Sequence, residues 1–158
     1  MKLTITQFLI QGYPESLALA ALAIAIAGQK LMFRDVLLVG TLQAVTALVV
    51  RSLPITFGIH TLILLTLLTF YLNTVLKIPI LACFRGALVS LICLGVFEML
   101  FLGSIASIMG LKMGDIASAP LLLTFLALPQ VGATIALGLI IDYIRFKKGG
   151  RMTDAGGS

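Results

Sequence analysis

A few side chains in this sequence could do chemistry, and they lie within or beside long apolar runs. The stretch RSLPITFGIHT at residues 51–61 holds Arg51 and His60, the only histidine in the chain. Glu98 lies inside another apolar run, and Glu15 lies near the start of a third. Ionisable residues inside a membrane segment usually face the protein interior, pair and mark function. Arg51 would suit an anionic group, and Glu98 its counter-charge or a proton carrier.

Motifs of known catalytic types are missing from the sequence. It contains no Gly-rich phosphate loop, and a single histidine cannot form a HExxH zinc site. A serine or cysteine nucleophile would need a base, and Cys83 and Cys93 are expected in the inner half, away from His60. These cysteines are ten positions apart in one expected helix, so they cannot bridge each other and match no metal motif. We therefore expect no enzyme activity, catalytic residue, metal site or cofactor.

The composition is that of a membrane protein. Hydrophobic residues make up 60% of the chain and charged residues 11%, whereas soluble domains carry about 25% charged residues. Apolar runs of about 18 residues or more recur, which is the signal for transmembrane helices. We expect an all-α, polytopic transmembrane helical bundle with about five membrane-spanning helices. Its partner is the lipid bilayer rather than nucleic acid, because the net charge of +5 comes mostly from loops and the tail.

Proline and glycine residues divide these runs into five expected spans, at about residues 14–28, 35–51, 57–76, 80–108 and 120–144. Residues 3–11 are too short to span and are expected to form an interfacial turn. Gly95 is a candidate re-entrant break in the fourth span, and Pro129 should kink the fifth. Residues 1–148 then form a single transmembrane domain, and residues 149–158 a disordered cytoplasmic tail.

Five spans place the two termini on opposite sides of the cell membrane. The positive-inside rule puts the basic tail in the cytoplasm and the N-terminus outside. Eight of the eleven basic residues then lie inside: Lys30, Arg34, Lys77, Arg85, Arg145, Lys147, Lys148 and Arg151.

This topology predicts an outward-facing polar cavity. Glu15, Arg51 and His60 would lie at outer helix ends, and Glu98 would form the floor about 15 Å below the outer end of its helix, at a rise of 1.5 Å per residue. Gln43, Ala47 and Arg51 share a helix face through the i, i+4, i+8 spacing. The expected ligand-binding residues are Glu15, Gln43, Arg51, His60, Glu98 and Gln130. Asp142 and Arg145 are expected to form a local i, i+3 pair.

Each of these residues also has a structural interpretation. Arg51 can extend its charged head to the interface, and Glu15 can interact with the positive start of a helix. His60 can lie in the headgroup zone, and the glutamines can join helices through hydrogen bonds. Glu98 is the hardest to interpret in this way, because a deep carboxylate needs a partner or a proton.

Two phrases carry a family resemblance: QGYPESLALAALAIAIAG at residues 11–28 and RSLPITFGIHT at residues 51–61. They resemble small multi-span membrane proteins of Firmicute-type bacteria that are related to input modules of sensor histidine kinases. The resemblance covers the first three expected helices and carries no known ligand motif. The chain has no phosphoacceptor or ATP-binding domain, so the resemblance implies a stand-alone membrane sensor that signals through another protein.

Three functions therefore remain open. The first is a ligand- or partner-sensing module with a membrane or cytoplasmic signalling partner. The second is a substrate-binding membrane subunit of a small-molecule transporter, which would dock its partner through the alanine-rich face of the first helix. The third is a structural membrane subunit, for which a homo-oligomer is the expected form.

Overall fold

The computed structural model describes residues 8–52, 57–109 and 120–153. Every element in these ranges is helical, which confirms an all-α helical bundle. A short π-helical turn, η1, precedes five α-helices. Their bounds are η1 Phe8–Gly12, α2 Tyr13–Ala27, α3 Phe33–Ser52, α4 Phe57–Leu76, α5 Ile80–Met109 and α7 Pro120–Thr153. The middle of the hinge at residues 51–61 and the loop before α7 lie outside the described residues.

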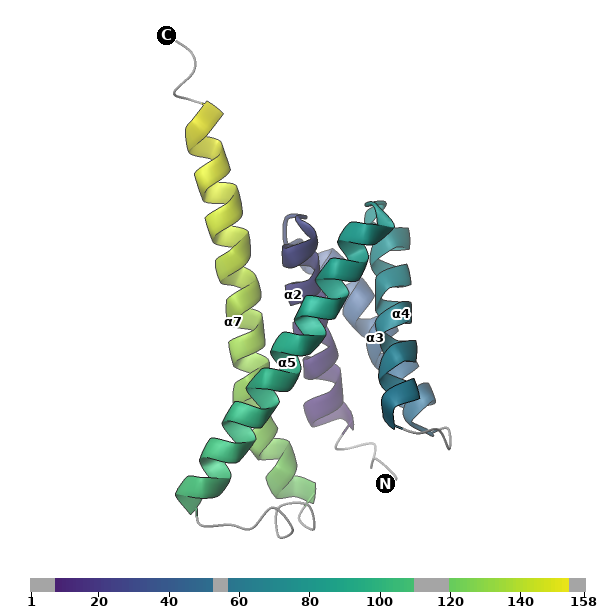
Figure 1. The fold of residues 1–158 in the computed structure, drawn as a ribbon, viewed down its shortest axis with the longest axis vertical. Helices are drawn as coiled ribbons and strands as arrows, with labels where there is room; N and C mark the ends of the chain where they lie inside the picture. Colours follow the sequence, from purple (N-terminus) through teal and green to yellow (C-terminus); the bar gives the residue numbers. More distant parts are fainter. Residues whose placement is uncertain (1–7, 53–56, 110–119, 154–158) are drawn as a thin grey trace.

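The helices run alternately up and down (Figure 1). The turns between α2 and α3 and between α4 and α5 lie at the end from which the C-terminal part of α7 projects. The starts of α2 and α4 lie at the opposite end. Basic residues of the two turns and of α7 therefore share one end of the bundle, as the positive-inside reading requires. The side of the membrane on which that end lies stays a prediction.

Within the described part of the chain, four helical segments are long and apolar enough to cross a membrane: Phe8–Ala27, Phe33–Ser52, Gly58–Leu76 and Ile80–Phe101. The first begins earlier than predicted, because η1 continues directly into α2 instead of forming an interfacial turn. Pro14 lacks a backbone N–H, and a π-helical turn before it is one of the ways a helix absorbs such a defect. The chain is therefore an integral membrane protein by the length and composition of its helices.

The two longest helices differ from the prediction in their details. α5 continues unbroken through Gly95, so the re-entrant break proposed there is wrong. α7 is helical through Pro129, and its lower part turns away from the axis of its upper part (Figure 1). α7 also continues to Thr153, past residue 149 where the tail was predicted to begin. The rest of that tail lies outside the described residues.

Helix α2 is the centre of the bundle and packs against α3, α5 and α7. Its alanines let neighbouring backbones come close, and residues 18–25 are all buried. Gly40 of α3 and Gly86 of α5 make the closest approaches: a Cβ would lie 3.0 Å from Cα of Leu17 at Gly40, and 2.5 Å from the Ala23 carbonyl oxygen at Gly86. The alanine face proposed for docking a transporter partner is therefore covered by the protein itself, and that part of the transport hypothesis is wrong.

The outer surface of the bundle is apolar and its interior contains polar groups, which is the arrangement expected in lipid. Large exposed side chains include Leu62, Ile92 and Leu139, each more than half exposed. Buried polar side chains are Ser16, Gln43, Thr69, Ser90, Gln130 and Thr134. Most of the buried hydroxyls donate to a carbonyl of the preceding helical turn, so they need no water.

The turn between α2 and α3 is held by α7. Gly28 ends α2 with φ 92°, a left-handed conformation that favours glycine. Arg145 donates from Nη1 to the Ala25 carbonyl at 3.3 Å, and Asp142 accepts a hydrogen bond from the Leu31 N–H at 2.9 Å. Asp142 and Arg145 thus each bond the backbone of this turn, and the pair predicted between them does not form. A cation at the end of α2 is also favoured by the helix dipole.

Candidate polar cavity at one end of the bundle

A small cavity of about 70 Å³, with a few polar residues in a mostly apolar lining, lies between α2, α3, α4 and α5. Space of this size can hold a few water molecules or one small polar group. Three of the six predicted site residues line it: Glu15, Gln43 and Arg51. The other lining residues are Ser16, Leu19, Ala47, Leu64, Leu91 and Leu94. The polar groups of the cavity therefore come from α2 and α3, which also contribute Leu19 and Ala47, and α4 and α5 contribute only leucines.

Glu15 enters the cavity from the first turn of α2. Two hydrogen bonds fix the backbone around it: Ser16 Oγ donates to the Gly12 carbonyl at 2.8 Å, and the Tyr13 and Thr41 hydroxyls are 3.1 Å apart. The first bond holds the junction of η1 and α2, and the second joins α2 to α3. These contacts, at Tyr13 and Ser16 on either side of Glu15, hold the start of α2 that carries Glu15 into the cavity wall.

Arg51 is the electrostatic centre of this end of the bundle. Its charge acts on both Glu15 and His60, and the charge of Glu98 also acts on Glu15. Among the described residues, however, neither Glu15 nor Arg51 has a hydrogen bond or an ion-pair partner. The carboxylate and the guanidinium face the same cavity while remaining open to other groups.

Gln43 is the deepest polar group of the cavity, and it is only 2% exposed. Its Nε2 donates to the Leu64 carbonyl of α4 at 3.2 Å. A carbonyl can only accept a hydrogen bond, so the amide must present Nε2, and not Oε1, to Leu64. The Oε1 atom has no hydrogen-bond partner in the described structure. The predicted shared face of α3 is confirmed, because Gln43, Ala47 and Arg51 all line the cavity.

The other three predicted residues lie outside the cavity. Glu98 is exposed on α5, and Leu91 and Leu94 occupy the wall where Glu98 was expected as the floor. The charge of Glu98 still acts on Glu15, although Glu98 does not line the cavity.

His60 and Gln130 have a feature in common with Gln43, although neither lines the cavity. His60 lies in the first turn of α4, and its Nε2 is buried without a partner among the described residues. Gln130 lies on α7, is 1% exposed, and its Oε1 is likewise unpartnered there. Neither of these predicted residues lines the space between Glu15 and Arg51.

Apart from Ala47, which was predicted on the helix face of Gln43 and Arg51, sequence reasoning missed the remaining wall of the cavity. Ser16 adjoins Glu15, and Ala47 lies midway between Gln43 and Arg51 on one helix face, so both carried a usable signal. Leu64, Leu91 and Leu94 carried none, because nothing distinguishes them from other apolar residues of α4 and α5. Within the described ranges, no three His, Cys, Asp or Glu side chains gather closely enough to hold a metal ion.

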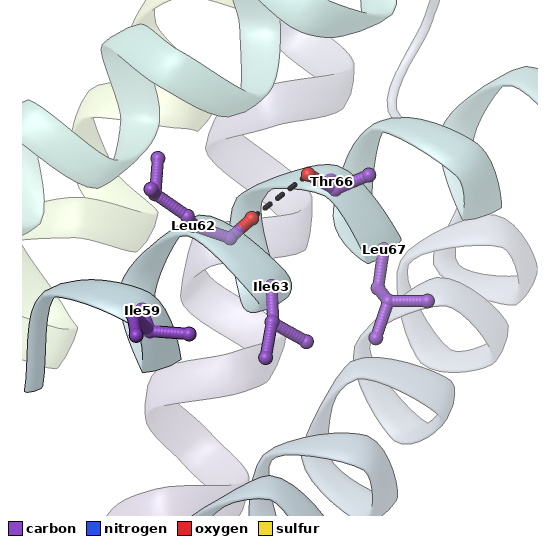
Figure 2. Close-up of a pocket in the computed structure, with 5 residues that line it drawn as sticks. All are labelled: Ile59, Leu62, Ile63, Thr66 and Leu67. Carbon is purple, nitrogen blue, oxygen red and sulfur yellow. Dashed lines mark hydrogen bonds between the residues drawn. The ribbon is translucent and has the colours of Figure 1, made fainter. Parts of the chain in front are cut away.

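A larger hollow, of about 360 Å³, has a different chemistry. It lies along one face of α4 and is lined by Ile59, Leu62, Ile63, Thr66 and Leu67 (Figure 2). Thr66 Oγ1 donates to the Leu62 carbonyl at 2.8 Å, so its hydroxyl is already used within the helix. The hollow is shallow and apolar, which suits hydrocarbon chains of the bilayer and offers no polar recognition.

Comparison with protein-family models, curated proteins and solved structures found no match. The interpretation of the cavity accordingly depends on its own residues. An acid, an arginine and an unpartnered amide oxygen around a small space can bind a polar or charged group. They supply no nucleophile with an adjacent base.

Proposed function

We propose that this integral membrane protein is a ligand- or partner-sensing module and that its ligand binds in the cavity between Glu15, Gln43 and Arg51. The supporting observation is that Gln43 lines the cavity while its buried Oε1 has no hydrogen-bond partner in the described structure. A buried acceptor left unpaired costs roughly 1–3 kcal/mol. A ligand that brings a hydrogen-bond donor into the cavity would remove this cost.

The packing of α2 offers a route for the signal. Glu15 and Ser16 lie at its first turn, and the Ala25 carbonyl at its last turn accepts the bond from Arg145. Because α2 is held tightly against its neighbours, a shift at the cavity would be passed to the turn that α7 contacts. In the orientation given by the positive-inside rule, the cavity opens outside and α7 leads into the cytoplasm, where a signalling partner would bind.

Native mass spectrometry of the protein, extracted in mild detergent, tests this function. We expect the wild type to retain a small polar ligand together with a signalling partner such as a kinase. Glu15→Gln should lose most of the ligand, whereas Glu98→Gln is a matched control that should retain it, because Glu98 does not line the cavity.

Three results would overturn the proposal. Equal ligand content in the wild type and Glu15→Gln would mean that the cavity is not the site. A stable homo-oligomer with no small molecule in either protein would instead support a structural membrane subunit. Recovery with an ATPase-driven module, with the ligand retained, would favour the transport alternative.

A further inference from the structure

We propose that the ligand of this cavity carries a primary ammonium group a few bonds from an anionic group, as ethanolamine phosphate does. This assignment rests on the proposed binding function and specifies the ligand class for the same site. The group would come either from a free zwitterion or from the headgroup of phosphatidylethanolamine, since both present the same chemistry.

The inner wall of the cavity presents acceptors. Gln43 Oε1 is free because its Nε2 is used by the Leu64 carbonyl. Ser16 also lines the cavity, and its Oγ gives its hydrogen to the Gly12 carbonyl at 2.8 Å, so this hydroxyl could only accept a further hydrogen bond. The carboxylate of Glu15 adds a negative charge beside them. An ammonium group has three N–H donors and no acceptor, which matches this wall.

The rim of the cavity has the opposite character. Arg51 lies eight residues after Gln43 on the same helix, which places its backbone about 12 Å further along the axis at 1.5 Å per residue. Its side chain lines the cavity while remaining largely exposed. A guanidinium binds phosphate and carboxylate groups through paired hydrogen bonds. The cavity therefore offers an anion site at its mouth and a cation site deeper inside.

The size of the cavity limits the cationic group. A cavity of about 150 Å³ is enough for benzene, and this one has about 70 Å³. It has room for an ammonium with one or two methylenes, which would contact Leu19, Leu91 and Leu94. A trimethylammonium group is larger and has no N–H donor. Choline derivatives should consequently be rejected for both their size and their hydrogen bonding.

Ligand binding to the purified protein in phosphatidylcholine nanodiscs tests the assignment. Ethanolamine phosphate is added in one arm, phosphocholine in a second, and phosphatidylethanolamine replaces part of the lipid in a third. Native mass spectrometry and the thermal unfolding midpoint report binding. We expect ethanolamine phosphate or phosphatidylethanolamine to bind at least tenfold more tightly than the choline analogue. Binding in the lipid arm alone identifies a headgroup as the source.

Matched variants connect the binding to these atoms. Gln43→Leu should reduce binding at least tenfold, whereas Gln130→Leu should not, although it also removes a buried glutamine with an unpartnered Oε1. Should Gln43→Leu fail to fold, Ala47→Leu replaces it in the test. This substitution fills the cavity and should cause the same loss of binding. Arg51→Gln should weaken ethanolamine phosphate more than ethanolamine, because only the former has an anionic group.

Equal binding of the ethanolamine and choline compounds would overturn the assignment, as would unchanged binding in both Gln43→Leu and Ala47→Leu. The proposed function has a separate outcome. A ligand of another class that is present in the wild type and lost from Glu15→Gln would leave the binding function standing and refute only the ammonium assignment.

Discussion

The close approach of α5 to α2 gives a quantitative prediction at Gly86. A Cβ at this position would lie 2.5 Å from the Ala23 carbonyl oxygen and 3.2 Å from the Ala27 Cβ. The carbonyl belongs to the backbone of a buried helix, so it cannot move aside as a flexible side chain would. Overpacking of this kind typically costs 1–3 kcal/mol. We expect Gly86→Ala to lower the free energy of unfolding by about 2 kcal/mol.

Gly95 is a matched control on the same helix, because no atom lies within 4 Å of the Cβ that would be added there. Gly95→Ala should be neutral or stabilising by about 0.5–1 kcal/mol, since alanine favours the helix. Unfolding in mixed micelles, followed by helical circular dichroism, measures both variants. The reasoning about packing on α2 would be refuted by a Gly86→Ala protein as stable as Gly95→Ala.

Two further predictions concern contacts between helices. Arg145→Gln removes a charged donor from the Ala25 carbonyl at the end of α2 and should lower the free energy of unfolding by about 1 kcal/mol. Arg85 is an exposed arginine on α5, so the control Arg85→Gln should change the free energy of unfolding little. Equal effects of the two variants would contradict the role given to Arg145. The Thr46 and Tyr71 hydroxyls are 2.6 Å apart and join α3 to α4. A double-mutant cycle with Thr46→Val and Tyr71→Phe should give a coupling free energy of about 0.6 kcal/mol. A coupling of zero would show that this hydrogen bond contributes nothing to stability.

The helices and part of the site were predictable from the sequence for simple reasons. Apolar runs interrupted by proline and glycine give the helix order, and alternating direction then brings particular helix ends together. Gln43 and Arg51 are eight residues apart, which places them on one face of any α-helix. Glu15 joined them because it begins the neighbouring helix at the same end of the bundle.

The remaining features depend on helix tilt and on contacts that the sequence does not encode locally. Glu98 was expected to form the cavity floor from its depth along the helix, but it is exposed, and α5 contributes Leu91 and Leu94 to the cavity instead. The start of the first span was misjudged because proline is common at helix starts, and the π turn before Pro14 was not foreseen. The central position of α2 was also hidden, since alanine suits both lipid-facing and buried positions.

Water access to the cavity tests the central claim most directly. In a background with Cys83→Ser and Cys93→Ser, single cysteines are introduced by Ala47→Cys and Leu48→Cys. Ala47 lines the cavity, whereas Leu48, the next residue of α3, is 40% exposed on the apolar outer surface. Charged methanethiosulfonates react with thiols only in contact with water, and the 2-aminoethyl reagent is small enough to suit this space. A cysteine at position 47 should react readily with this reagent, and a cysteine at position 48 should not. Equal reactivity at the two positions, or faster reaction at position 48, would contradict a water-accessible polar cavity at this end of the bundle.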